Sequence, residues 1–381
     1  MPSTLLFAEA THIKLLRRAR LIPVEDRHEA ARRCVLLFAL AWLPLALLVL
    51  TQAGAASLFF RDITAQVRYL VALPLLVVAD YIVLPRAEAL GRYFLESSLL
   101  PPSMREAYRD MASAVRKRSA GPLTALGIAA VVYASMLAMY FILPGPQWAA
   151  WQRQASTGAF SLAGWWHLLV SLPILLGLIL SWAWRWLLWV RLLWWLARAG
   201  LVLMPSHPDG AAGLGFLADS PRMFIPVVIP LAVVVAATLG HSLVLEGVTA
   251  VGHEATPLIT AGLAIVVFAS PPLLFARVLV AARHDGMLEY GELCRNVGLV
   301  FEQRWLGGRT PVDPGVLERP DFSATTDLYG LSVNVFEMKL LLVDYPTLVA
   351  LALASVLPFA PLWLAAVPFH AVVDHIVGML V

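Results

Sequence analysis

Long apolar stretches alternate with charged segments along the chain, and seven of these stretches are long enough to cross a membrane. We expect spans at residues 34–53, 68–84, 122–143, 164–184, 223–245, 257–281 and 345–367. A helix needs about 20 mostly apolar residues to span a bilayer. The stretches are continuous, whereas the strands of a membrane barrel would alternate. The pattern therefore predicts an all-α, polytopic transmembrane helix bundle.

The fourth stretch continues into a segment rich in tryptophan and arginine. After residues 164–184 the chain reads RWLLWVRLLWWLARAG, with Arg185, Arg191 and Arg198 at helical spacing. Indole rings and long arginine side chains are typical of a helix at the level of lipid headgroups. We expect Arg191 and Arg198 to face anionic lipid, and a cation–π stack against a neighbouring helix is the alternative.

Composition supports a membrane location, and the distribution of charge predicts an orientation. Hydrophobic residues make up 60% of the chain and charged residues 14%, with a mean hydropathy of +0.77. Ordinary soluble domains carry about 25% charged residues, so that class is excluded. With the N-terminus inside, all but three of the 28 Lys and Arg residues fall on the inner side, the exceptions being Arg61, Arg68 and Arg153. This bias predicts an N-in, C-out orientation.

The same pattern divides the chain into four parts. A basic cytoplasmic leader (1–33) precedes a six-span membrane domain (34–281), which contains a cytoplasmic helical loop at 85–121. A cytoplasmic segment follows at 282–339, and residues 340–381 hold the final span and an outer tail. This last part is long enough that a hairpin is the alternative to one span.

Three stretches together resemble a family of uncharacterised bacterial polytopic inner-membrane proteins. They are YLVALPLLVVAD, SHPDGAAGLGFL and DLYGLSVNVFEMKLLLVDYP, which begin at Tyr69, Ser206 and Asp327. The resemblance covers most of the chain in order and spacing. It implies a multi-pass protein of the bacterial inner (cytoplasmic) membrane and no particular activity.

Prolines interrupt every predicted span except the third. They are Pro44, Pro74, Pro173, Pro226, Pro230, Pro271, Pro272, Pro358 and Pro361. Each removes a backbone hydrogen bond and kinks its helix. Broken helices build the binding sites of transporters, although proline is also commoner in membrane helices in general.

Asp80 is the acidic residue that lies well inside a predicted span. An ionised carboxylate at that depth must be paired or face water, so Asp80 belongs either to a solute pathway or to a buried ion pair. Arg185 or Arg277, at similar depth, is the expected partner in a buried ion pair. The pathway interpretation makes Asp80 a proton or cation relay.

The turn after the fourth span, SHPDGAAGLGFL, contains His207, Asp209, Gly213 and Gly215. Its glycines could present backbone amides to an anion. It lacks a P-loop lysine and the GxGxxG spacing, and a helix stop explains the glycines as well.

Histidines and carboxylates gather on the predicted outer side and are weak candidates for a metal site. They are His241, Glu246, His253, Glu254, His370 and Asp374. Imidazole and carboxylate suit zinc or iron, but these residues form no compact ligand motif, and we expect no cofactor.

These features favour an integral membrane channel or transporter for an ion or small solute, and we expect it to be a homo-oligomer. The alternatives are a membrane-anchored signalling or defence effector that acts through residues 282–339, and a membrane enzyme with an outer-face His/carboxylate site. We expect anionic lipids as partners on the cytoplasmic side. Nucleic acid is not an expected partner, because the basic residues lie close to the membrane.

Overall fold

The computed structural model of the chain consists of helices joined by short connections. It describes residues 6–7, 29–142, 148–154, 157–244, 253–306 and 320–366. Seven helical runs in this part of the chain are long and apolar enough to cross a membrane. The runs are Glu29–Leu50, Ile63–Glu96, Pro122–Ile142, Leu162–Leu196, Gly215–Val244, Thr256–Trp305 and Tyr345–Trp363. This confirms the all-α class and the multi-pass membrane architecture with seven candidate spans.

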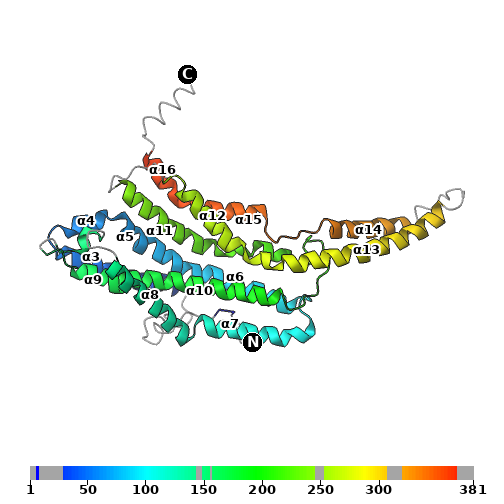
Figure 1. Ribbon diagram of the computed structural model, residues 1–381, viewed down its shortest axis with the longest axis horizontal. Helices are drawn as coiled ribbons and strands as arrows, with labels where there is room; N and C mark the ends of the chain where they lie inside the picture. Colours follow the sequence, from blue (N-terminus) through cyan, green and yellow to red (C-terminus); the bar gives the residue numbers. More distant parts are fainter. Residues whose placement is uncertain are drawn as a thin grey trace, which may run out of the picture.

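Two long helices form the centre of the bundle (Figure 1). Helix α6 (Leu73–Glu96) and helix α10 (Leu172–Leu196) pack against each other. Helix α2 (Glu29–Ala41) and helix α11 (Ile225–Val244) both pack on α6. Residues of α6 are therefore enclosed on several sides, which buries Asp80 and Glu88 together with apolar side chains.

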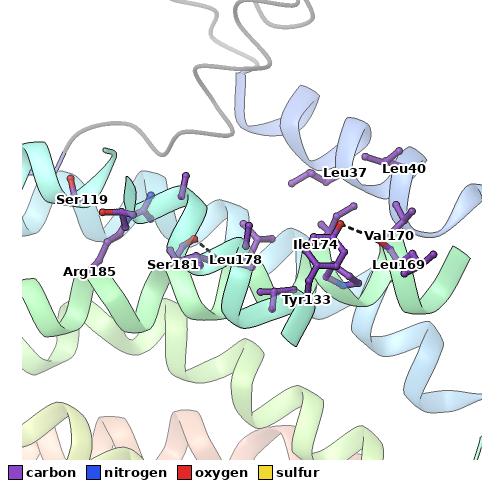
Figure 2. A pocket seen from close by; sticks show the side chains of 17 residues that line it. Leu37, Leu40, Ser119, Tyr133, Leu169, Val170, Ile174, Leu178, Ser181 and Arg185 are labelled. Carbon is purple, nitrogen blue, oxygen red and sulfur yellow. Dashed lines mark hydrogen bonds between the residues drawn. The ribbon is translucent and has the colours of Figure 1, made fainter. Parts of the chain in front are cut away.

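The remaining spans lie further from the centre. Helix α8 (Pro122–Ile142) packs on α10 at the periphery, and most of its side chains are exposed. A cavity of about 470 Å³ separates part of α8 from α10 and α2 (Figure 2). On the other side of the bundle, helix α12 (Thr256–Ala269) pairs with helix α15 (Tyr345–Val356). The apolar side chains exposed on these outer helices are suited to helix surfaces that face lipid.

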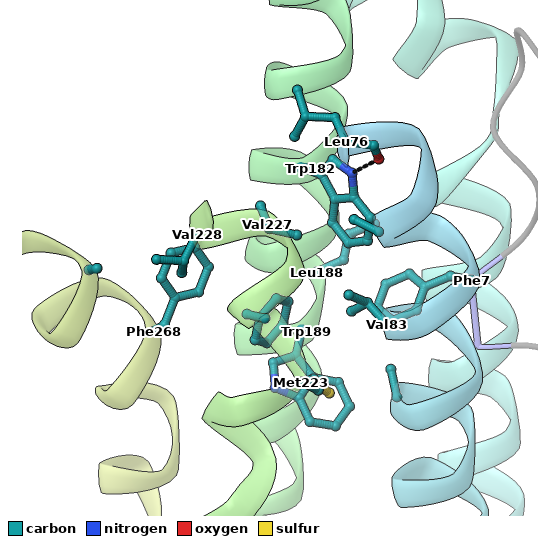
Figure 3. Close-up of a cluster of buried hydrophobic side chains, with 14 of the residues drawn as sticks. Phe7, Leu76, Val83, Trp182, Leu188, Trp189, Met223, Val227, Val228 and Phe268 are labelled. Atoms are coloured by element: carbon teal, nitrogen blue, oxygen red, sulfur yellow. Dashed lines mark hydrogen bonds between the residues drawn. The ribbon is translucent and has the colours of Figure 1, made fainter. Parts of the chain in front are cut away.

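The core of the bundle is filled by large apolar side chains. Figure 3 shows Trp182 and Trp189 of α10 packed between Leu76 of α6 and Met223, beside Phe268 of α12. Burial of one such aromatic side chain removes about 150–250 Å² from solvent or lipid and gives the contact its specific geometry. The centre of the monomer is thus packed with side chains.

The helical geometry changes next to several prolines. A π-helical turn at Arg68–Ala72 directly precedes α6, whose second residue is Pro74, and another at His167–Ser171 precedes Pro173 of α10. Proline cannot donate to the carbonyl four residues earlier and clashes with it, and a wider turn relieves both problems. These changes of helix type occur where the sequence predicts interruptions, while the kink angles stay a prediction.

Two helices extend further than the apolar pattern predicts. Helix α6 continues through Pro85 to Glu96, so the predicted loop at 85–121 begins inside a helix. Helix α13 (Ala276–Trp305) continues far beyond the expected end of the sixth span, because residues 282–305 contain no proline to end it. With helix α14 (Pro320–Phe336) it forms an arm that projects from the bundle (Figure 1).

The last span is continuous in the described part of the chain. It consists of α15, a 3-10 turn at Leu357–Phe359 and helix α16 (Ala360–Ala366).

Helix α7 (Arg105–Ser119) is polar and lies beside the end of α10. Most of the predicted leader and the predicted outer tail lie outside the described residues.

Candidate functional site

The carboxylate of Asp80 lies between two guanidinium groups inside the bundle. Its Oδ1 accepts a hydrogen bond from Nη1 of Arg185 at 2.5 Å, and its Oδ2 accepts one from Nη2 of Arg33 at 2.8 Å. All three side chains are buried, with exposed fractions of 2% for Arg33, 6% for Asp80 and 3% for Arg185. We call these three residues the Asp80 cluster. It joins α2, α6 and α10 by charge-assisted hydrogen bonds, which are about twice as strong as neutral ones.

The register between α6 and α10 brings Arg185 to Asp80. On α10, Trp182 and Arg185 are three residues apart and so share one face; on α6, Leu76 and Asp80 are four apart and do the same. Trp182 donates its Nε1–H to the carbonyl oxygen of Leu76 at 3.2 Å. The guanidinium of Arg185 lies 4.9 Å from the centre of the Trp182 ring. The two interhelical hydrogen bonds therefore fix the same register.

Arg33 reaches the cluster from the first turns of α2. Its Nη1 donates to the hydroxyl of Tyr81 at 3.0 Å, and its guanidinium lies 5.2 Å from the centre of that ring. Tyr81 follows Asp80 on α6, so neighbouring residues of one helix hold different nitrogens of the same guanidinium. This arrangement anchors the beginning of α2 to α6.

The carboxylate of Asp80 is shared between two guanidinium groups, so Arg185 contacts it through Nη1 alone. Each carboxylate oxygen serves one guanidinium, and arginine stays charged at any physiological pH. Within the described residues, Nη2 of Arg185 is buried and has no hydrogen-bond partner. A buried donor left unsatisfied costs free energy, about 1–3 kcal/mol. The cluster is therefore suited to accept a further negative group at Arg185.

Arg185 also lies at one end of the cavity between α8 and α10. Figure 2 places it near Ser119 and Ser181, while Leu40 and Leu169 lie at the opposite end. The cavity thus has a polar end and an apolar end. Its volume falls within the range of about 300–1,000 Å³ that is usual for sites that take small molecules.

Of the two alternative partners predicted for Asp80, the structure brings Arg185 into contact with it. Arg277 instead lines a separate cavity with Trp194 and Arg198 and does not pair with Asp80. Arg277 lies in the first turn of α13, which packs on α14 and on the 3-10 turn at Pro271–Phe275. Sequence reasoning missed Arg33, which it placed in the leader. The available signal was its position directly before the first apolar stretch.

A second polar cluster lies around Asp62, before the start of α6, and the sequence did not predict it. Asp62 accepts hydrogen bonds from the backbone N–H of Ala65 at 3.0 Å and from Nε1–H of Trp151 at 2.9 Å. Nδ1 of His241 lies 3.4 Å from the Asp62 carboxylate, and Nδ1 of His167 lies 3.2 Å from the amide nitrogen of Gln152. Asp62 caps helix α5 (Ile63–Val67), a common role for aspartate at a helix start.

The predicted metal candidates do not converge in the part of the chain that the structure describes. No group of three or more His, Cys, Asp or Glu side chains there could hold a metal ion. His241 pairs with Asp62, while His253 and Glu254 are exposed in the turn before α12. The candidates Glu246, His370 and Asp374 lie outside the described residues.

The glycine-rich turn is closed by its own aspartate. Asp209 accepts hydrogen bonds from the backbone N–H groups of Ala211 at 2.8 Å, Gly213 at 3.1 Å and Gly215 at 2.7 Å, and lies 2.9 Å from Nδ1 of His207. The amides that could have held an external anion are therefore occupied. Partial burial raises the pKa of Asp209, but these hydrogen bonds outweigh it, so that its pKa is lowered from the ordinary value.

The tryptophan and arginine segment carries its arginines on the surface. Arg191 and Arg198 are both exposed on or just after α10, as expected for groups that reach lipid headgroups. The guanidinium of Arg198 lies 3.8 Å from the centre of the Trp194 ring. This contact is a cation–π pair within one segment, whereas the alternative prediction was a stack against a neighbouring helix.

Comparison of the chain with protein-family models, with curated proteins and with solved structures finds no match. Function is therefore inferred from the geometry of the described residues. Among the clusters above, the Asp80 cluster combines the deepest burial of charge with an adjacent cavity.

Proposed function

We propose that the protein is a membrane channel or transporter that passes anionic solutes, with Arg185 as the residue that selects their charge. The observation that carries this proposal is the sharing of Asp80 between two arginines, which leaves one guanidinium nitrogen of Arg185 without a partner. Charged side chains inside a membrane bundle are expensive and are commonly kept for function.

The geometry argues against a cation or proton relay through Asp80. Both carboxylate oxygens already accept hydrogen bonds from guanidinium groups at 2.5–2.8 Å. A cation approaching Asp80 would be repelled by two positive charges within the same contact distance. The predicted relay at Asp80 is therefore replaced by an anion site at Arg185.

The core of the monomer is filled by side chains, so a solute would have to pass at the edge of the bundle. Large aromatic groups close the space between α6, α10 and α11 (Figure 3). The cavity beside α8 lies at the periphery, where a second copy of the chain could complete its wall. We therefore keep the proposal of a homo-oligomer, which cross-linking in native membranes followed by mass determination tests.

Flux measurements on the full chain in liposomes of zwitterionic lipid test the proposed function. We expect nitrate and halide flux above that of empty liposomes and no matching flux of potassium. Arg185→Lys should keep the anion preference, since it keeps the charge, and Arg185→Gln should lose it. Arg191→Gln, an exposed arginine on the same helix, is the matched control and should behave as the wild type. Absence of flux, or a preference for cations, rejects the proposal.

One observation favours a second candidate function, that of a membrane-anchored effector. The arm of α13 and α14 projects from the bundle and exposes large apolar residues, including Leu288 and Val300. Exposed apolar side chains outside the membrane level are typical of interaction surfaces. Cleavage of the arm within residues 307–319 by an engineered protease site distinguishes the two candidates. Flux that survives cleavage supports the transporter, whereas loss of a cellular phenotype without any flux in the intact chain supports the effector.

A further inference from the structure

We propose that the cavity between α8 and α10 binds one anionic membrane lipid, with its phosphate group at Arg185 and an acyl chain along the apolar wall. This inference goes beyond the passage of anions and does not require it, although both use Arg185. It rests on the shape of the cavity, on the order of polar and apolar groups along it, and on the charge at one end.

The polar end offers several donors to a phosphate group. Arg185 carries the unpartnered Nη2, and the hydroxyls of Ser181 and Thr124 also line the cavity. These hydroxyls now donate to the carbonyl oxygens of Gly177 at 2.6 Å and Arg118 at 2.7 Å. A hydroxyl can rotate to donate elsewhere, so both can turn towards a bound anion.

The beginning of α8 adds positive potential at the same end. The helix starts at Pro122, which leaves the N–H groups of Leu123 and Thr124 without a partner within the helix. The N-terminus of a helix carries about half a positive charge and is a common site for phosphate. The basic run Arg116, Lys117 and Arg118 ends α7 directly before it. An anionic headgroup is thus favoured from several directions.

The rest of the wall is mostly apolar and follows the direction of an acyl chain; the hydroxyl of Tyr133 donates to the carbonyl oxygen of Leu169 at 3.2 Å. From Arg185 towards Leu169 the cavity runs along α10 and the π-helical turn before it, a length of roughly 20 Å at about 1.5 Å per α-helical residue. Ile128 and Val132 of α8 and Ile174 and Leu178 of α10 line this part of the cavity. Such a wall matches a hydrocarbon chain by burial of apolar surface.

A lipid fits this cavity better than a free anion because the cavity lies at the edge of the bundle. Helix α8 is the most exposed of the spans, with Leu126 and Leu137 facing outward, so the cavity borders the lipid phase. A molecule that already lies in the membrane can enter sideways. Its phosphate would stand at the level of the basic run that ends α7, where anionic headgroups are attracted.

Binding is tested on the purified full-length protein by thermal unfolding with added phosphatidylglycerol, phosphatidylcholine or inorganic phosphate. We expect a saturable rise of the unfolding temperature with phosphatidylglycerol, since a ligand that binds the folded state stabilises it. Phosphatidylcholine and inorganic phosphate should give little or no rise. Equal effects of the two lipids, or an effect of inorganic phosphate as large as that of phosphatidylglycerol, overturn the inference.

Two glycines provide a matched pair of variants that leave the Asp80 cluster intact. Gly177 lines the cavity, and a Cβ placed there meets no atom within 4 Å, so Gly177→Leu should fill the cavity without a backbone clash. Gly127 of α8 also has open space but does not line the cavity, and Gly127→Leu is the control. We expect Gly177→Leu to weaken phosphatidylglycerol binding by roughly tenfold or more, which corresponds to the loss of about 1.4 kcal/mol.

The outcomes separate this inference from the proposed function. Wild-type affinity in Gly177→Leu, with the control also unchanged, rejects the lipid site. Intact phosphatidylglycerol binding in a protein that shows no anion flux rejects the proposed function and leaves the lipid site standing. Arg185→Gln should weaken phosphatidylglycerol binding as well, and Arg185→Lys should restore much of it. If Arg185→Gln fails to fold, the pair of glycine variants decides the question.

Discussion

Asp80 of α6 and Arg185 of α10 form a buried ion pair at the level where Trp182 donates to the carbonyl of Leu76. The pair alone would be neutral, but Arg33 of α2 takes the other carboxylate oxygen. Buried ion pairs are costly to desolvate, and removal of one partner leaves an uncompensated charge. The arrangement thus gives the bundle a specific register and leaves Arg185 partly unpaired.

The turn closed by Asp209 should lose stability when its acceptor is changed. In Asp209→Asn the side chain can no longer accept from three backbone N–H groups with a full negative charge. We expect a loss of roughly 1–3 kcal/mol, as for hydrogen bonds to charged groups. Thermal unfolding at neutral pH measures it. An unchanged unfolding temperature would show that the turn is held by its glycines alone.

The same residue predicts a pH dependence with a definite sign. The folded-state pKa of Asp209 is lowered, so its contribution is present above the unfolded value of about 3.9 and is lost as pH falls through the folded value. Below about pH 4 the difference in stability between wild type and Asp209→Asn should therefore shrink as the pH falls. A difference that grows as the pH falls through this acidic range would contradict the hydrogen-bond pattern of this turn.

The attachment of the arm to the bundle depends on close packing at Gly286. A Cβ at this position of α13 would lie 2.7 Å from Pro205 and 3.1 Å from Val335 of α14. Gly286→Leu should therefore push these segments apart and cost roughly 1–3 kcal/mol, as overpacking does. Gly291→Leu on the same helix meets open space and is the control. Limited proteolysis of the arm should accelerate in the first variant only.

The N-in orientation can be tested at two exposed positions. In a background without Cys34 and Cys294, single cysteines replace Ser113 of α7 and Thr157 in the connection before α9 (Leu162–Trp166). A membrane-impermeant thiol reagent added to intact cells should label the cysteine at 157 and spare the one at 113. Labelling of both from the same side would contradict the seven-span arrangement with its positive inner face.

Much of the fold could be predicted from the sequence because bilayer thickness sets the length of the apolar runs. The stretches at 122–143 and 345–367 correspond to helical runs at Pro122–Ile142 and Tyr345–Trp363. Helix ends were less predictable. Helix α13 continues into polar sequence, where hydropathy does not predict where the helix ends. The helix can continue there because the sequence contains no proline to end it.

The candidate site was only half predictable. The depth of Asp80 in an apolar run required a partner, and Arg185 lay at similar depth, so that this pairing followed from the cost of buried charge. Arg33 stands before the first apolar stretch, a position typical of an arginine that reaches headgroups. The packing of α2 along α6 brings Arg33 into contact with Asp80 inside the bundle. Asp62 and Trp151 meet through tertiary contacts that spacing in the sequence does not reveal.

The balance of charge in the Asp80 cluster is the central claim, and a double-mutant cycle tests it most directly. Unfolding temperatures in detergent would be compared for wild type, Asp80→Asn, Arg185→Gln and the double variant, with Arg191→Gln as a control on the same helix. Asp80→Asn strands Arg185 in the bundle and should cost about 3–5 kcal/mol. Arg185→Gln should cost less, because Asp80 still holds Arg33.

The double variant gives the decisive comparison. Removal of Arg185 together with the Asp80 charge takes one of the two cations that contacted Asp80 out of the bundle, so the double variant should be more stable than Asp80→Asn alone, by a coupling of roughly 0.5–3 kcal/mol. Additive losses, or a double variant less stable than either single one, would contradict the account of Arg185 as a buried cation compensated by Asp80.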